Sequence, residues 1–212
     1  MILPLLHLFN DGYLAAMPLI LPFASEEFAL SLGIVGLLGS LLSFSGIILA
    51  IPAGVTASKF GALRLLSMAV LFYSLGFLIL GLSSGVITVV LAFIIASIAF
   101  GIFHPLAFSA VAKASQHSSL GRQMGVFAAT GDIGRIAFAA AVTFIIGLTS
   151  WRFTSLLYAA AAAALFILSI FLSRGKDVSG YGHAEKGKKK IDTALLKNST
   201  FMLANASSLL DA

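Results

Sequence analysis

The sequence lacks cysteine and is poor in charge, and both absences restrict what the protein can be. Charged residues make up 10% of the 212 residues, against about a quarter in a soluble domain. Without cysteine there is neither a disulfide nor a thiolate metal site, and the four histidines show no metal-ligand spacing. We therefore expect no metal and no cofactor. The first apolar run has no basic segment before it and is too long for a signal peptide, so we expect no cleavable leader.

Apolar residues fill most of the chain. They make up 59% of it, and the mean hydropathy is +1.06. A bilayer-spanning helix needs about 20 apolar residues, and six runs approach or exceed that length. These runs cover residues 2–23, 33–57, 63–82, 86–112, 123–148 and 153–172. We therefore expect an all-α integral membrane protein with the lipid bilayer as its first partner.

Basic residues gather in alternate loops. Two lie in each of the loops at 58–64 and 113–122, and seven lie in 174–197. The other loops hold one base, Arg152, and the remaining base is Arg135, inside an apolar run. Because basic loops stay in the cytoplasm, we expect the N-terminus and the basic loop to be cytoplasmic. A cytoplasmic basic linker also accounts for the net charge of +5 better than nucleic-acid binding does.

The chain divides into three segments by composition. Residues 1–173 hold the six apolar runs, and residues 174–197 form a basic, glycine-containing linker. Residues 198–212 are again apolar and small, but this stretch is too short to span a bilayer. We interpret it as the start of a truncated seventh helix.

Small residues predict where helices approach one another. In the second run Gly46, Ala50 and Gly54 recur every four residues, and the fifth run is also rich in glycine. Such faces let two helix backbones come close in a membrane. We expect the second and fifth helices to be packing elements and the third and sixth to be peripheral.

Polar side chains interrupt the first apolar run. His7, Asn10 and Asp11 are three and four residues apart, which places them on one helix face. Asp11 lies about 15 Å along the helix at 1.5 Å per residue. A charge at that depth costs at least about 2.5 kcal/mol and usually faces a bundle interior or a wet cavity.

Two further runs carry polar groups. In the fourth run Pro105 has no N–H, which frees the carbonyl of Gly101 close to the imidazole of His104. In the fifth run Asp132 and Arg135 lie three residues apart on one helix face. The simplest alternative is that this acid and base pair with each other and only fix helix packing.

These groups occur at similar depth on three helices. His104 lies about 12 Å and Asp132 about 14 Å from the cytoplasmic ends of their helices, close to the depth of Asp11. His104 could still be a hydrogen-bonded core residue, and His7 could serve an interfacial role. A carboxyl group in a low dielectric is also a candidate for proton exchange near neutral pH. A proton-coupled carrier needs such a group.

The junction between the second and third runs resembles the signature loop of the major facilitator superfamily. That signature is a glycine, three residues, an acid, a base, any residue, a glycine and a later base. Ser58 stands where the family usually has aspartate, and a Trp151-Arg152 turn is also similar to the family. The matching residues of this gating loop are Gly54, Lys59, Gly61 and Arg64.

Within that superfamily the chain resembles the fosmidomycin-resistance-like exporters most. His7, Asn10 and Asp11 in the first helix and the Phe103-His104-Pro105 stretch in the fourth carry this resemblance. It implies a six-helix N-terminal half made of two inverted three-helix repeats, which needs a second six-helix half, normally in the same chain. It also implies a prokaryotic cell (inner) membrane and transport by alternating access, without enzymatic catalysis.

The resemblance assigns roles to the polar residues. Asp11 would couple transport to protons or another cation, with Asn10 orienting it, and Asp132 would be the second acid. Arg135 would contact an anionic group or hold Asp132 charged, and His104 would relay protons or contact substrate. Proton-coupled efflux of a small drug-like or organic-anion compound is the expected function. Uptake of an organic anion and a non-transporting scaffold or sensor are the alternatives, and no nucleophile or metal triad supports a membrane enzyme.

Overall fold

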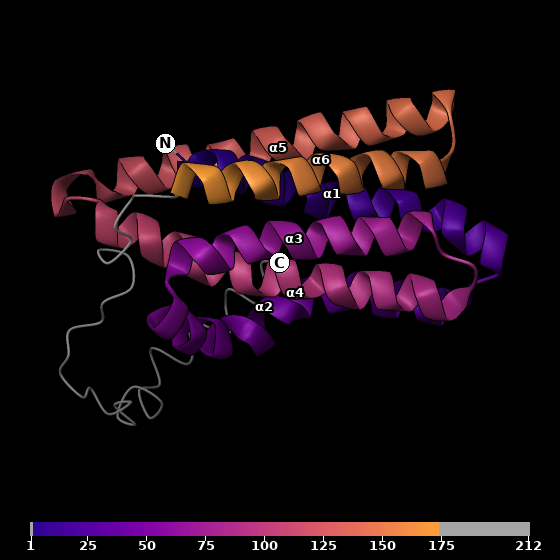
Figure 1. Ribbon diagram of the computed structural model, residues 1–212, viewed down its shortest axis with the longest axis horizontal. Coiled ribbons are helices and arrows are strands. Elements are labelled where there is room, and N and C mark those ends of the chain that lie inside the picture. Colours follow the sequence, from indigo (N-terminus) through magenta and orange to yellow (C-terminus); the bar gives the residue numbers. More distant parts are fainter. Residues whose placement is uncertain (1, 174–212) are drawn as a thin grey trace. The chain divides into compact units, whose positions relative to one another are not determined.

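The computed structural model describes residues 2–173, and all regular secondary structure in this part of the chain is helical (Figure 1). The predicted linker 174–197 and the predicted seventh helix 198–212 lie outside the described residues. A single 3-10 turn, η1 (His117–Ser119), precedes the fifth long helix. The six long helices are α1 (Ile2–Phe28), α2 (Leu32–Phe60), α3 (Ala62–Gly81), α4 (Val86–Ala114), α5 (Leu120–Leu148) and α6 (Trp151–Ser173).

Helices α2 to α6 are long and apolar enough to cross a membrane, which confirms five of the six expected spans. Helix α1 has 27 residues and so also has the length to cross. It is not among the five because His7, Asn10 and Asp11 lower its hydropathy. All three side chains are buried, so α1 turns its polar groups into the bundle and not toward lipid.

The helices pack in pairs that relate the two halves of the described chain. Helix α1 lies along α5, and α2 lies along α4, while α3 lies against both α4 and α6. If α1–α3 and α4–α6 are two repeats, α1 is equivalent to α4 and α2 is equivalent to α5. In each case the first helix of one repeat then packs against the second helix of the other, α1 against α5 and α4 against α2. The arrangement is therefore consistent with two three-helix repeats in one six-helix half of a transporter.

The expected roles of the helices were wrong for α3. In its most apolar window 61% of the residues are buried, against 17% for both α2 and α5. The physical reason is that α3 lies between α4 and α6 and contributes Tyr73 and Phe77 to the aromatic core. In α2, a Cβ added at Gly54 would meet nothing within 4 Å among the described residues. Helices α2 and α5 thus present wide uncovered faces.

The gating-loop residues lie where α2 turns into α3. Gly61 has φ +90 and ψ 137, a backbone conformation that requires glycine, and its N–H donates to the carbonyl of Ala57 at 2.8 Å. The Ser58 hydroxyl donates to the Val55 carbonyl at 2.7 Å, so it bonds its own helix. Lys59 and the first-turn Arg64 of α3 are exposed.

Three connections meet at one end of the bundle. Arg152, at the start of α6, forms an ion pair with Glu27 near the end of α1. Its guanidinium also donates to the carbonyl of Ser83, in the turn between α3 and α4, at 2.6 Å. The indole N–H of Trp151 donates to the second oxygen of Glu27 at 3.1 Å. These contacts place all three connections on the same side, as the alternation of loops requires.

Candidate functional site

Two glycines bring α5 against α1. A Cβ on Gly134 would overlap the carbonyl oxygen of Leu8, and a Cβ on Gly131 would lie 2.6 Å from Cε1 of His7 and 2.7 Å from Oδ2 of Asp11. Only glycine permits this approach, because the opposing atoms at Gly134 are backbone. The close packing delivers the polar face of α1 directly to the middle of α5.

Asp11 lies at the centre of the polar cluster and is 1% exposed. Its Oδ2 accepts from Arg135, with Nη2 at 2.8 Å and Nε at 3.0 Å. Its Oδ1 accepts from the Asn10 amide at 2.9 Å, the contact by which Asn10 was expected to orient it. Two histidine nitrogens also approach Oδ1. Both carboxylate oxygens therefore have partners, drawn from three helices.

His7 has a defined tautomer. Its Nδ1–H donates to the carbonyl of Phe127 at 2.8 Å, because a carbonyl oxygen can only accept. The imidazole also stacks on the Phe127 ring, with centroids 4.0 Å apart. Its other nitrogen, Nε2, lies 3.4 Å from Oδ1 of Asp11 and has no hydrogen-bond partner among the described residues. Nε2 therefore carries a proton only when the imidazole is cationic.

His104 reaches the same oxygen from α4. Its Nε2 lies 3.1 Å from Oδ1 of Asp11, and its ring lies 4.8 Å from that of Phe100. The side chain is 18% exposed, so one side of the cluster is accessible to water. Its Nδ1 is buried and makes no hydrogen bond within the part of the chain that the structure describes.

The structure brings the predicted pathway residues together, with Asp132 at the exposed edge of the cluster. Arg135 binds Asp11, and its nearest approach to Asp132 is 3.8 Å between Nη1 and Oδ1. The Asp132 side chain is 68% exposed and that of Arg135 50% exposed. Asp132 therefore lies beside the buried cluster, on the open face of α5.

Sequence reasoning missed two components of the cluster. The Phe127 carbonyl holds His7, and a backbone acceptor leaves no signal in side-chain chemistry. The other component is the pair Gly131 and Gly134, which the sequence showed only as part of a glycine-rich helix. Their spacing of three residues, next to Asp132 and Arg135, was the available signal that this face of α5 packs closely on α1. Gly125, on the same helix, faces open space among the described residues.

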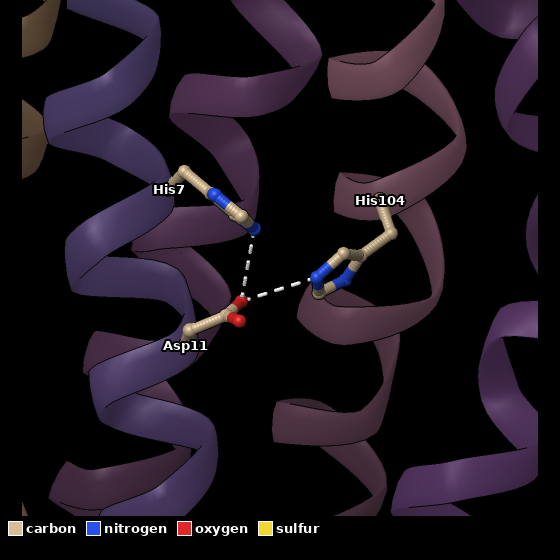
Figure 2. A group of neighbouring side chains, drawn as sticks. All are labelled: His7, Asp11 and His104. Atoms are coloured by element: carbon tan, nitrogen blue, oxygen red, sulfur yellow. Dashed lines mark ion pairs between the residues drawn. The ribbon is translucent and has the colours of Figure 1, made fainter. Parts of the chain in front are cut away.

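The cluster also has the side chains of a possible metal site. Candidate ligand atoms of His7, Asp11 and His104 all lie within 4.8 Å of one another (Figure 2). The sequence suggested no metal-ligand spacing because His104 comes from a distant helix. The i, i+4 spacing of His7 and Asp11 was the available signal.

The long apolar helices, which enclose a buried acid paired with a base of another helix, define an integral membrane protein. Comparison with protein-family models matches residues 5–210 to the Major Facilitator Superfamily. The chain therefore belongs to the Major Facilitator Superfamily, a family of secondary transporters. A comparison with curated proteins finds no match.

Proposed function

We propose that the chain is half of a proton-coupled secondary transporter that exports a small drug-like or organic-anion compound by alternating access. The carrying observation is that Arg135, half-exposed on the open face of α5, binds the buried carboxylate of Asp11. A charged pair in mid-helix that is only partly covered cannot face lipid at acceptable cost. It faces a water-filled cavity, and the neighbouring Asp132 lines that cavity too.

The proposal of proton coupling rests on which nitrogen and oxygen atoms of the cluster carry a proton. His7 gives its one neutral N–H to Phe127, so Nε2 and the carboxylate oxygen face each other as two acceptors. A single added proton relieves this arrangement, on His7 or on the carboxyl group. When Asp11 is protonated, its attraction for Arg135 falls, and the guanidinium is free to bind an anionic group. Exchange of one proton thus changes the contact between α1 and α5, which is the coupling step we propose.

The direction of transport follows from the resemblance to fosmidomycin-resistance-like exporters, carried by the same His7, Asp11 and His104. Proton-driven export against substrate makes this an antiporter, with drug resistance as a physiological outcome. Uptake of an organic anion uses the same Arg135 contact with the opposite direction of flux. A sensor or scaffold does not need a charge pair that opens onto a cavity, and we rank it below both.

A second six-helix half completes the cavity in this proposal. Large apolar side chains remain exposed on α2 and α5, including Ile51, Phe44, Ile136 and Phe144. Ile136 and Phe144 lie on α5 together with the exposed Asp132, so this helix carries both exposed apolar side chains and an exposed acid. Such a surface fits a partner half across a cavity. We further propose that the protein lies in a prokaryotic inner membrane, with its N-terminus and basic loop on the cytoplasmic side.

Counterflow and uphill transport in proteoliposomes test the proposal, with this half joined to a second six-helix half. Asp11→Asn should lose proton-driven accumulation but retain part of the substrate exchange, because exchange needs binding and rocking without net proton movement. Asp132→Asn should weaken substrate binding and leave coupling in place. Normal uphill transport by Asp11→Asn would contradict the proposal. The 212-residue chain alone is expected to give no gradient-driven flux.

A further inference from the structure

His7 is arranged as a metal ligand. In metal sites a histidine usually donates its second ring N–H to a carbonyl or carboxylate, which fixes the tautomer and leaves the other nitrogen for the ion. The 2.8 Å bond from Nδ1 to the Phe127 carbonyl is such a contact. The opposite nitrogen, Nε2, is buried without a hydrogen-bond partner in residues 2–173 and points at Asp11.

The two distances from Asp11 to the imidazoles suit a small ion, and the imidazoles must close in to share it, because the three ligand atoms spread over as much as 4.8 Å whereas ligands of one zinc ion lie no more than about 4.2 Å apart. Zinc holds nitrogen and oxygen ligands at about 2.0–2.2 Å, so neighbouring tetrahedral ligand atoms lie about 3.3–3.5 Å apart. Oδ1 of Asp11 lies 3.4 Å from Nε2 of His7 and 3.1 Å from Nε2 of His104. Figure 2 shows both imidazoles directed at this one oxygen.

The rest of the carboxylate is already engaged. Arg135 binds Oδ2 through two nitrogens, and the Asn10 amide uses one lone pair of Oδ1. The second lone pair of Oδ1 faces Nε2 of His7 and Nε2 of His104, so an ion bound between these three atoms would have Asp11 as a monodentate ligand. The partial exposure of His104 lets water reach a fourth position. Two imidazoles with one carboxylate favour a zinc-like ion over magnesium or calcium, which prefer oxygen ligands.

We propose that His7, Asp11 and His104 bind one divalent transition-metal ion of the zinc class. Nε2 of His7 and Oδ1 of Asp11, two acceptors that face each other at 3.4 Å, would then bind the same cation. The positive charge of Arg135 opposes a second cation nearby, so binding should be weaker than in a closed structural zinc site. The ion takes the position of the coupling proton, and metal should therefore inhibit transport. This consequence for transport rests on the proposed function, whereas the binding itself does not.

Cobalt binding to the purified full chain in nanodiscs tests the site directly. The chain should carry a histidine-free purification tag and the changes His117→Gln and His183→Gln, so that its only imidazoles are His7 and His104. We expect one Co²⁺ per chain, with the intense visible absorption of four-coordinate cobalt. Either His7→Gln or His104→Gln in this background should abolish that absorption, and zinc should displace the cobalt.

X-ray absorption of the zinc-loaded background chain gives a result that needs no site variant. It should show two imidazole ligands at about 2.0 Å. No saturable cobalt binding by the folded background chain, or equal binding by the His104→Gln variant, would overturn the metal site. Circular dichroism and gel filtration confirm folding of each variant. Transport that still depends on Asp11 in a chain without metal binding would leave the proposed function intact while removing this one.

Discussion

The guanidinium of Arg135 binds the carboxylate of Asp11 across two helices, with Nη2 2.8 Å and Nε 3.0 Å from the same oxygen. The sequence pointed to another partner, because Asp132 is three residues away on the same helix. Arg135 and Asp132 remain within ion-pair distance, at 3.8 Å, but both side chains are exposed and the closer contact of Arg135 is with Asp11. Helix α5 is thus joined to α1 by Asp11, the one buried acid among residues 2–173.

Removal of Arg135 alone should destabilise the six-helix half. Arg135→Gln leaves the buried Asp11 without its counter-charge, and breaking a buried pair costs about 3–5 kcal/mol. Because Arg135 is half-exposed, we expect a loss of about 1–3 kcal/mol. The double change Asp11→Asn with Arg135→Gln should recover most of it. Thermal melting of the purified variants measures both.

Asp132→Asn is the matched control for this cycle. The Asp132 side chain is 68% exposed, so its neutralisation should change stability by no more than about 0.5 kcal/mol. A larger loss for Asp132→Asn than for Arg135→Gln would mean that the pair within α5 is the important one, and would contradict the geometry described here.

Gly134→Ala should separate α5 from α1. The added methyl group would overlap the Leu8 carbonyl oxygen, and neither backbone can move cheaply. We expect a loss of about 1–3 kcal/mol, typical of overpacking, measured as a lower melting temperature. Gly125→Ala is the control on the same helix, where a Cβ meets nothing within 4 Å among the described residues. It should be neutral or stabilise α5 by up to about 1 kcal/mol, and equal effects of the two changes would refute the close approach.

The sequence predicted the membrane class and the helix count because both follow from hydropathy over about 20 residues. It also predicted that α1 and α4 contribute polar residues at one depth, because rise per residue is a local property. It could not identify the partner of Arg135, which depends on how α5 docks on α1. The burial of α3 was missed for a related reason, since apolar residues look alike whether they face lipid or protein.

Labelling of single cysteines should place Glu26 and Lys188 on opposite sides of the membrane. The chain has no native cysteine, so a reporter introduced at one position is unambiguous. We expect Glu26→Cys to react from outside the cell and Lys188→Cys, in the basic segment, only from the cytoplasm. This follows from the basic residues of alternate loops. Reaction of both positions from the same side would contradict the topology.

The ion pair between Glu27 and Arg152 should make stability depend on pH at acidic values. Glu27 lies past the first apolar run, and its hydrogen bond from Arg152 holds the pKa of its carboxyl group below the ordinary value of 4.5. A lowered pKa means that the folded chain favours the ionised carboxylate. The contribution of the pair is therefore complete above about pH 4.5 and is lost as pH falls through the lowered pKa.

Glu27→Gln tests this contribution against Glu26→Gln, a neighbouring exposed acid that forms no ion pair within residues 2–173. At neutral pH the Glu27 variant should melt below the wild-type chain, because Arg152 loses a charged partner that also accepts from Trp151. The difference should shrink as pH falls below about 4.5, since the wild-type carboxylate then protonates as well. If the difference in melting temperature did not depend on pH, packing of the Glu27 side chain and not its charge would hold the end of α1 against the start of α6.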